Sequence, residues 1–183
     1  MAPPSKKKRI ESKRFEQTMV DMLKTQIEYI FKNLTQWMYD NNANDKDKDD
    51  EIFYKECEKV QQLAKRYSSS EILGVLVNYL NELDGMEATV EFANVLFASG
   101  FCDIKYNNPY PLIALLYKKA GLDTQKDCSK SEKQTFVEEN IFWSCAVTLS
   151  KKSGFYHGYT DQYEPFDDTR FMRELTSLKE RRF

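Results

Sequence analysis

The only histidine of the chain, His157, lies in a segment rich in aromatic and acidic residues, a combination that acid–base chemistry can use. His157 would act as general base there, with Asp161 or Glu164 as its carboxylate partner. No nucleophile or oxyanion-hole sequence accompanies it, so we expect no catalytic residues. Packing of the rings against the body is a simpler interpretation. The functional interpretation that we favour is a partner-docking patch, because tyrosine and phenylalanine are common at binding hot spots. Its candidate residues are Tyr156, His157, Tyr159, Tyr163 and Phe166.

A second candidate site is the acidic segment 45–56, whose carboxylates could bind a metal ion. Acidic residues occupy its first, third, fifth, seventh and twelfth positions: Asp45, Asp47, Asp49, Glu51 and Glu56. This spacing resembles the calcium-binding loop of the EF-hand family, and the resemblance covers the segment alone. It implies a calcium-responsive helical protein. The sixth position is Asp50, where the family has glycine for a sharp turn, so an acidic, solvated linker is the favoured alternative.

The third candidate is a basic block within residues 1–14, which we expect to be a disordered arm. Its six cations are Lys6, Lys7, Lys8, Arg9, Lys13 and Arg14. Residues 4–9 resemble a monopartite nuclear-import signal. The same side chains could instead neutralise the phosphates of a nucleic acid, or the arm could be an inert, solubilising tail.

The composition excludes several other classes of protein. The chain has 183 residues and a net charge of −2, so with a basic arm the remainder must be net acidic. Its four cysteines are far apart and form no CxxC pair, which predicts reduced thiols and argues against a zinc site. They are Cys57, Cys102, Cys128 and Cys145, of which Cys145 is expected in the core. The sequence shows no phosphate-binding glycine motif, no secretory signal and no membrane-spanning run. We therefore expect no cofactor, no membrane partner, and a nuclear or cytoplasmic protein.

The elements that must position these sites are helices. Apolar residues recur at steps of three and four from Phe15 to Met38, which predicts a long amphipathic helix over about 11–39. Capping-box spacings at Ser68 and Ser129 and glycines at 85, 100 and 121 mark further helix ends. The additional helices are expected at about 52–67, 68–84, 86–98, 111–121, 129–149 and 168–181.

The predicted fold is therefore all-α, an irregular bundle of about six to seven helices with a long N-terminal amphipathic helix. Residues 15–183 are expected to form a single domain, interrupted by an acidic loop at 40–51 and an aromatic loop at 153–167. The predicted function is that of a non-enzymatic helical adaptor or subunit of a protein assembly, acting at or near nucleic acid. Protein partners are expected, with nucleic acid as a further partner of the basic arm. The alternatives are a small enzyme that uses the His157 loop and a calcium-responsive protein that uses residues 45–56.

Overall fold

The computed structural model describes residues 5–42, 50–121, 145–146, 148–149 and 167–180. All regular structure in these residues is helical, which confirms the all-α prediction and the long first helix. The elements are α1 (Lys6–Asn42), α2 (Asp50–Arg66), α3 (Ser69–Glu82), α4 (Gly85–Ala98), the short 3₁₀ helix η1 (Phe101–Asp103), α5 (Tyr110–Lys119) and α8 (Asp168–Glu180). Most of the helix expected at 129–149 lies outside the described residues. Of that range the structure describes only Cys145, Ala146, Thr148 and Leu149, and these four are helical.

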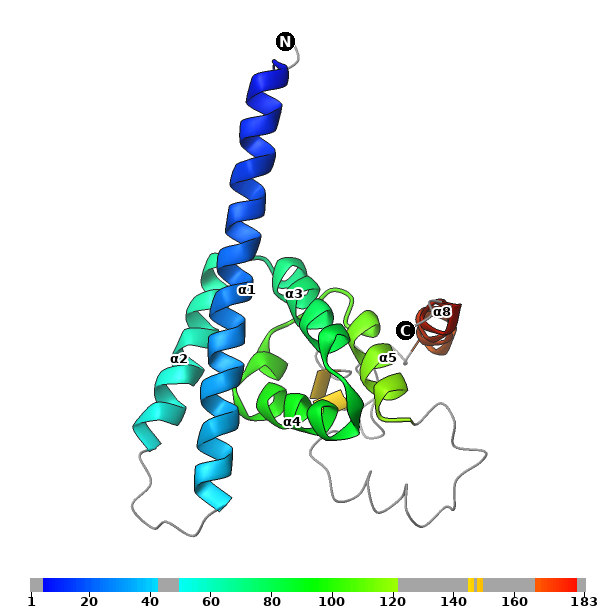
Figure 1. Ribbon diagram of the computed structural model, residues 1–183. Helices are drawn as coiled ribbons and strands as arrows, with labels where there is room; N and C mark the ends of the chain where they lie inside the picture. The colour runs from blue at the N-terminus through cyan, green and yellow to red at the C-terminus, as the bar shows by residue number, and fades with distance from the viewer. Residues whose placement is uncertain (1–4, 43–49, 122–144, 147, 150–166, 181–183) are drawn as a thin grey trace.

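The helices are arranged around the lower part of α1 (Figure 1). α2 packs antiparallel on one side of α1, and the α3–α4 pair packs on another side. α5 contacts α3 and α4, and α8 lies beyond α5. The order across the molecule is thus α2, α1, the α3–α4 pair, α5 and α8.

The first helix is longer than its apolar stripe predicted, and it is packed over only part of its length. Five stripe residues are fully buried: Leu23, Ile27, Ile30, Phe31 and Leu34. Phe15 and Met22, which belong to the same sequence stripe, are 68% and 42% exposed. The N-terminal half of α1 extends past the other helices and has none of them against it (Figure 1).

The core is centred on Phe31 of α1. Its ring stacks on Phe92 of α4 and on Phe101 of η1, with ring centroids 4.8 and 5.7 Å apart, and it also contacts Tyr79 of α3 at 5.1 Å. Close aromatic pairs of this kind add to the free energy gained by burying their area. One side chain of α1 therefore joins three elements of the body.

The third helix begins as the sequence predicted. The Ser68 hydroxyl accepts a hydrogen bond from the Glu71 amide, and the Glu71 carboxylate accepts one from the Ser68 amide, at 3.2 and 3.0 Å. This reciprocal capping box satisfies two amides that a helix start would otherwise leave without partners.

The end of α3 differs from the prediction, which placed a closing left-handed turn at Gly85. Gly85 does have a positive φ of 86°, but it is the first residue of α4, and Leu83 caps α3. The carbonyls at the end of α3 are satisfied from another helix. The Lys119 ammonium of α5 donates to the Asn81 carbonyl at 3.0 Å and to the Leu83 carbonyl. Partial burial lowers the pKa of Lys119.

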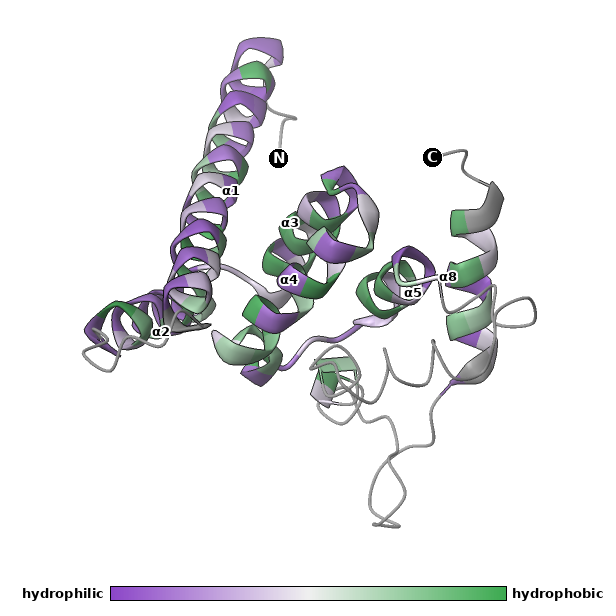
Figure 2. Cartoon of the chain, turned by 60° about the horizontal axis from the view of Figure 1, so that its bottom comes forward, coloured by the Kyte–Doolittle hydropathy of each residue, from purple (hydrophilic) through white to green (hydrophobic). Residues whose placement is uncertain are grey.

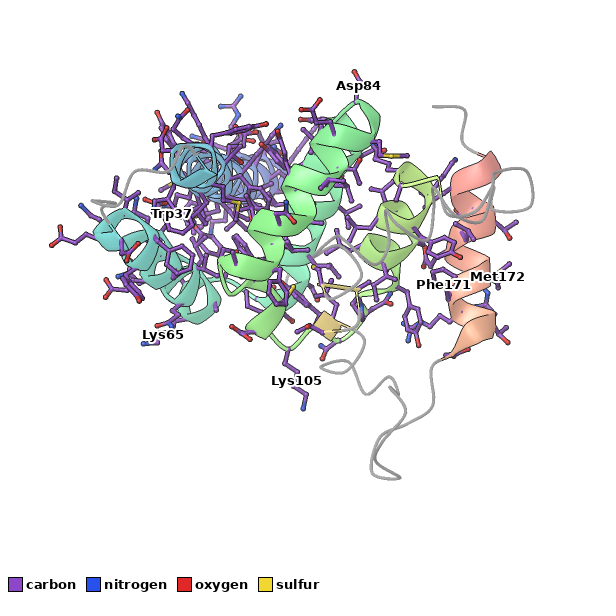
Figure 3. The ribbon with its side chains drawn as sticks, turned by 90° about the horizontal axis from the view of Figure 1, so that it is seen from below. Trp37, Lys65, Asp84, Lys105, Phe171 and Met172 are labelled. Atoms are coloured by element: carbon purple, nitrogen blue, oxygen red, sulfur yellow. The ribbon has the colours of Figure 1, made fainter. Side chains whose placement is uncertain are left out.

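The C-terminal residues that the structure describes contact the earlier elements through side chains. Buried Cys102 and Cys145 bring their Sγ atoms to 3.1 Å, so Cys145 is a core residue as expected. On α8, Phe171 points toward α5 and meets the Tyr117 ring edge-on at 5.5 Å, whereas Met172 points away from α5 (Figure 3). The last helix thus uses one face to pack.

Candidate binding surface at the free end of the first helix

The six predicted cations of the basic block lie together on the free end of α1. Residues 6–14 are helical and exposed, where the sequence had led us to expect a disordered arm. Every side chain from residue 5 to residue 18 is exposed. The free end is largely hydrophilic, with scattered apolar residues (Figure 2). The helix therefore carries the basic block away from the packed body.

The cations surround the helix axis rather than forming one face. Consecutive residues in an α-helix are turned by about 100° from one another, so residues 6–9 point in four different directions. Lys13 and Arg14 repeat the directions of Lys6 and Lys7 about two turns farther along. Within the described part of the chain, none of the six cations takes part in an ion pair. The free end of α1 is therefore a cationic tip that a ligand can approach from any side.

The start of α1 is electrostatically unfavourable for a helix. Ser5 supplies the cap, since its hydroxyl lies 3.4 Å from the Lys8 amide and its carbonyl accepts from the Arg9 amide at 3.0 Å. The first turn contains no acidic residue. A helix N-terminus carries partial positive charge from its unpaired amides, so cations there are destabilising and anions are stabilising. The tip thus combines side-chain and backbone groups that all favour a negatively charged ligand.

The structure places two of the candidate metal ligands, and they do not come together. Glu51 is exposed near the start of α2, whereas Glu56 is 3% exposed and faces α1. The Glu56 carboxylate accepts hydrogen bonds from Lys59 at 2.7 Å and Asn33 at 3.2 Å. The other three, Asp45, Asp47 and Asp49, lie outside the described residues. No cluster of three metal-ligating side chains occurs in the part of the chain that is described.

The aromatic loop expected at 153–167 lies outside the described residues except for its last residue. This applies to all five candidate docking residues: Tyr156, His157, Tyr159, Tyr163 and Phe166. At the end of the loop, the Asp167 amide donates to the Tyr110 hydroxyl at 3.0 Å. Arg170 lies over the Tyr110 ring, 5.2 Å from its centroid. Asp167 and the start of α8 thus lie against α5.

Sequence reasoning missed one charged surface, a hollow between α1 and α2 that is lined by Lys59 and Arg66. The sequence does show that Lys55, Lys59 and Arg66 are spaced by four and seven residues, as residues on one edge of a helix are. Nothing in the sequence, however, indicated which edge of α2 would lie beside α1.

No protein-family model, curated protein or solved structure matches this chain. Among the helices described, none combines the length and the apolar character needed to cross a bilayer.

Proposed function

We propose that the protein is a non-enzymatic helical adaptor, a subunit of a protein assembly, that contacts nucleic acid through the tip of α1. The observation that carries this proposal is the set of six exposed cations at residues 6–14, held on a helix that extends past the body. The two alternatives depend on the His157 loop and on residues 45–56, and His157 and residues 45–49 lie outside the described residues. The proposal is therefore built on α1.

The length and charge of the tip suit a phosphate backbone. Nine helical residues span about 13 Å along the helix axis. A DNA duplex presents one negative charge per about 1.7 Å of its axis, so the tip can reach several phosphates at once. Lysine and arginine contacts to phosphates position a protein without reading sequence, so we expect binding to depend on salt and not on base sequence.

Phosphate binding would also relieve an unfavourable feature of α1. Cations at Lys6, Lys7 and Lys8 oppose the helix dipole, and a phosphate beside them offsets part of this positive charge. Occupation of the tip should therefore stabilise the first turns of α1 as well as hold the ligand. This coupling between binding and helix formation supports a binding role for the tip over a purely solubilising one.

The proposal is tested with two variants that remove equal charge. K6Q/K7Q/K8Q removes three cations from the tip, and K32Q/K65Q/K105Q removes three exposed cations from elsewhere. Lys65 and Lys105 both point away from the body (Figure 3). Binding to a mixed-sequence DNA duplex is measured by fluorescence anisotropy at several salt concentrations. We expect the tip variant to reduce the slope of log K against log salt by about 2.7, because each phosphate contact contributes about 0.9. The control variant should change the slope much less.

Equal slopes for the tip variant and the unmodified chain would contradict phosphate contact. In that case a fluorescent reporter fused to residues 1–14 separates the remaining interpretations. Nuclear accumulation that K6Q/K7Q/K8Q abolishes would assign the block to import, and an even distribution would leave it as a solubilising tail.

A further inference from the structure

α1 and α2 enclose a hollow of about 360 Å³ on the surface of the molecule. Its floor is apolar, formed by the buried side chains of Ile30 and Leu63. Its rim is polar and comes from both helices, with Tyr29 on α1 and Lys59 and Arg66 on α2. An apolar floor with a polar rim is the usual construction of a recognition groove.

The rim is cationic on the α2 side and uncharged on the α1 side. Lys59 and Arg66 line the hollow, and Lys55, four residues before Lys59, lies on the same edge of α2 just beyond it. Lys59 is neutralised by the buried Glu56 carboxylate, 2.7 Å away, which is the acid that α2 supplies beneath the rim. Lys55 and Arg66 form no ion pair with any described residue. The groove is thus positive on a chain whose net charge is −2.

An exposed apolar seam continues from this groove along α1. Phe15, Met22 and Tyr29 are seven residues apart and are 68%, 42% and 60% exposed. Side chains at this spacing follow one face of a helix, and a heptad seam is the surface on which a second helix packs. Tyr29 belongs to both the seam and the groove, so the two surfaces are continuous.

We propose that the groove between α1 and α2 binds an acidic amphipathic helix of a partner protein. The apolar face of that helix lies on the Phe15–Met22–Tyr29 seam and the groove floor, and its carboxylates face Lys55 and Arg66. Helix-in-groove recognition of this kind uses apolar anchors for affinity and flanking charge for orientation and specificity. This inference rests on the adaptor part of the proposed function and supplies its partner surface.

The test uses designed peptides and the full chain. One probe peptide has about three heptads, with leucine at its core positions and glutamate at the flanking positions, and the second has lysine in place of each glutamate. Binding is measured by fluorescence anisotropy with labelled peptide. We expect the glutamate peptide to bind at least about tenfold more tightly than the lysine peptide, because opposite charges flank the groove. No binding of the glutamate peptide, or equal binding of both, would overturn the proposal.

Two matched pairs of variants locate the binding surface. Arg66→Glu should weaken the glutamate peptide by about tenfold, whereas Lys65→Glu, the adjacent exposed cation on another side of α2, should have little effect. Tyr29→Ala should weaken binding, whereas Tyr54→Ala, a tyrosine of similar exposure at 64%, should not. Equal effects within either pair would contradict this location. Circular dichroism confirms that each variant is folded.

Two further measurements distinguish other occupants. If the full chain sediments as a dimer that Arg66→Glu converts to a monomer, the groove is an interface between copies of this chain and the proposal fails. If the DNA duplex displaces the peptide from the groove and Arg66→Glu weakens DNA as strongly as K6Q/K7Q/K8Q does, the groove is a nucleic-acid surface and the proposal also fails. Peptide binding that survives K6Q/K7Q/K8Q supports the groove even if the tip does not bind DNA, so the two failures are distinguishable.

Discussion

The two halves of α1 belong to one continuous helix but have opposite surroundings. From Leu23 to Leu34, its aliphatic side chains and Phe31 are buried among α2, α3 and α4, and Tyr29 alone of its large apolar side chains there is exposed. From Lys6 to Thr18, all its side chains are exposed. The same periodic pattern therefore has two outcomes, which depend on whether other helices are present to cover it. Amphipathic spacing predicts a helix in both halves, but it predicts burial only where a partner element exists.

A second contrast concerns how helices begin. α3 starts with a complete capping box, formed by Ser68 and Glu71. α1 starts with Ser5 and has Lys8 at the position equivalent to Glu71. At this position α3 therefore has a stabilising acid, whereas α1 has a cation. This difference is what a tip selected for anion contact would show.

The largest expected effect separates the packed and free halves of α1. Ile27 is fully buried, so Ile27→Ala should lower the free energy of unfolding by about 2–5 kcal/mol. Phe15→Ala removes a larger but exposed side chain and should change the free energy of unfolding by less than about 0.5 kcal/mol. Denaturant unfolding followed by circular dichroism measures both. A large loss from Phe15→Ala would show that the free half is covered in solution.

High pH tests the packed body. Burial raises the pKa of Tyr106 far above its ordinary 10.0. Below pH 10 the phenol is protonated in both states and its contribution to stability is constant. Above pH 10 the unfolded chain releases this proton while the folded protein retains it, so stability falls by up to about 1.4 kcal/mol per pH unit. Denaturant unfolding between about pH 9 and pH 11 measures this slope.

Tyr106→Phe is the control for the alkaline prediction. It removes the hydrogen bond from the hydroxyl to the Phe101 carbonyl, 3.0 Å away, so it should lower stability near neutral pH by about 1 kcal/mol. It should also make the alkaline slope shallower. An unchanged slope would show that Tyr106 ionises in the folded protein as easily as in the unfolded chain.

Replacing one glycine within the body should increase the stability of the protein. A Cβ added to Gly74, inside α3, would meet no other atom within 4 Å. Gly74→Ala should therefore raise the free energy of unfolding by about 0.5–1 kcal/mol, because alanine favours the helix. Gly100→Ala is the control: its φ of 93° is left-handed and the new Cβ would lie 3.4 Å from Asp103, so it should destabilise. A loss of stability from Gly74→Ala would contradict the observation that a Cβ at this position meets no other atom.

The smallest expected effect concerns the tip itself. Lys8→Glu would complete a capping box with Ser5 and add an acid to the first turn, which should stabilise the start of α1 by about 0.5–1 kcal/mol. Slower amide exchange in residues 6–20 would report this gain. The same substitution should weaken DNA binding. Tighter DNA binding by Lys8→Glu would contradict phosphate contact by the tip.

The sequence predicted most of the fold because its signals were local. Heptad-like spacing located α1, and the Ser68–Glu71 spacing located the start of α3. It was limited where tertiary contacts decide the outcome. Phe15 carries the same pattern as Ile27 but has no helix beside it, and the end of α3 is satisfied by Lys119 from a distant part of the chain.

The candidate sites show the same limit. The six cations of the tip were identified from composition alone, since a block of like charge needs no partner to be recognised. Lys59 and Arg66 were not identified, because their edge of α2 has meaning only once α1 lies beside it. Glu56 was assigned to a metal site by spacing, whereas the structure pairs it with Lys59.

The reach of α1 also determines how the tip responds to ionic screening. Residues 6–22 rise about 25 Å along the helix axis. The Debye length at physiological ionic strength is about 8 Å, so carboxylates of the body are screened from an anion bound at Lys6. At about 0.01 M salt the Debye length rises to about 30 Å, and the acidic body would begin to repel that anion. The length of the exposed helix therefore lets a net acidic protein present an independent positive end at physiological ionic strength.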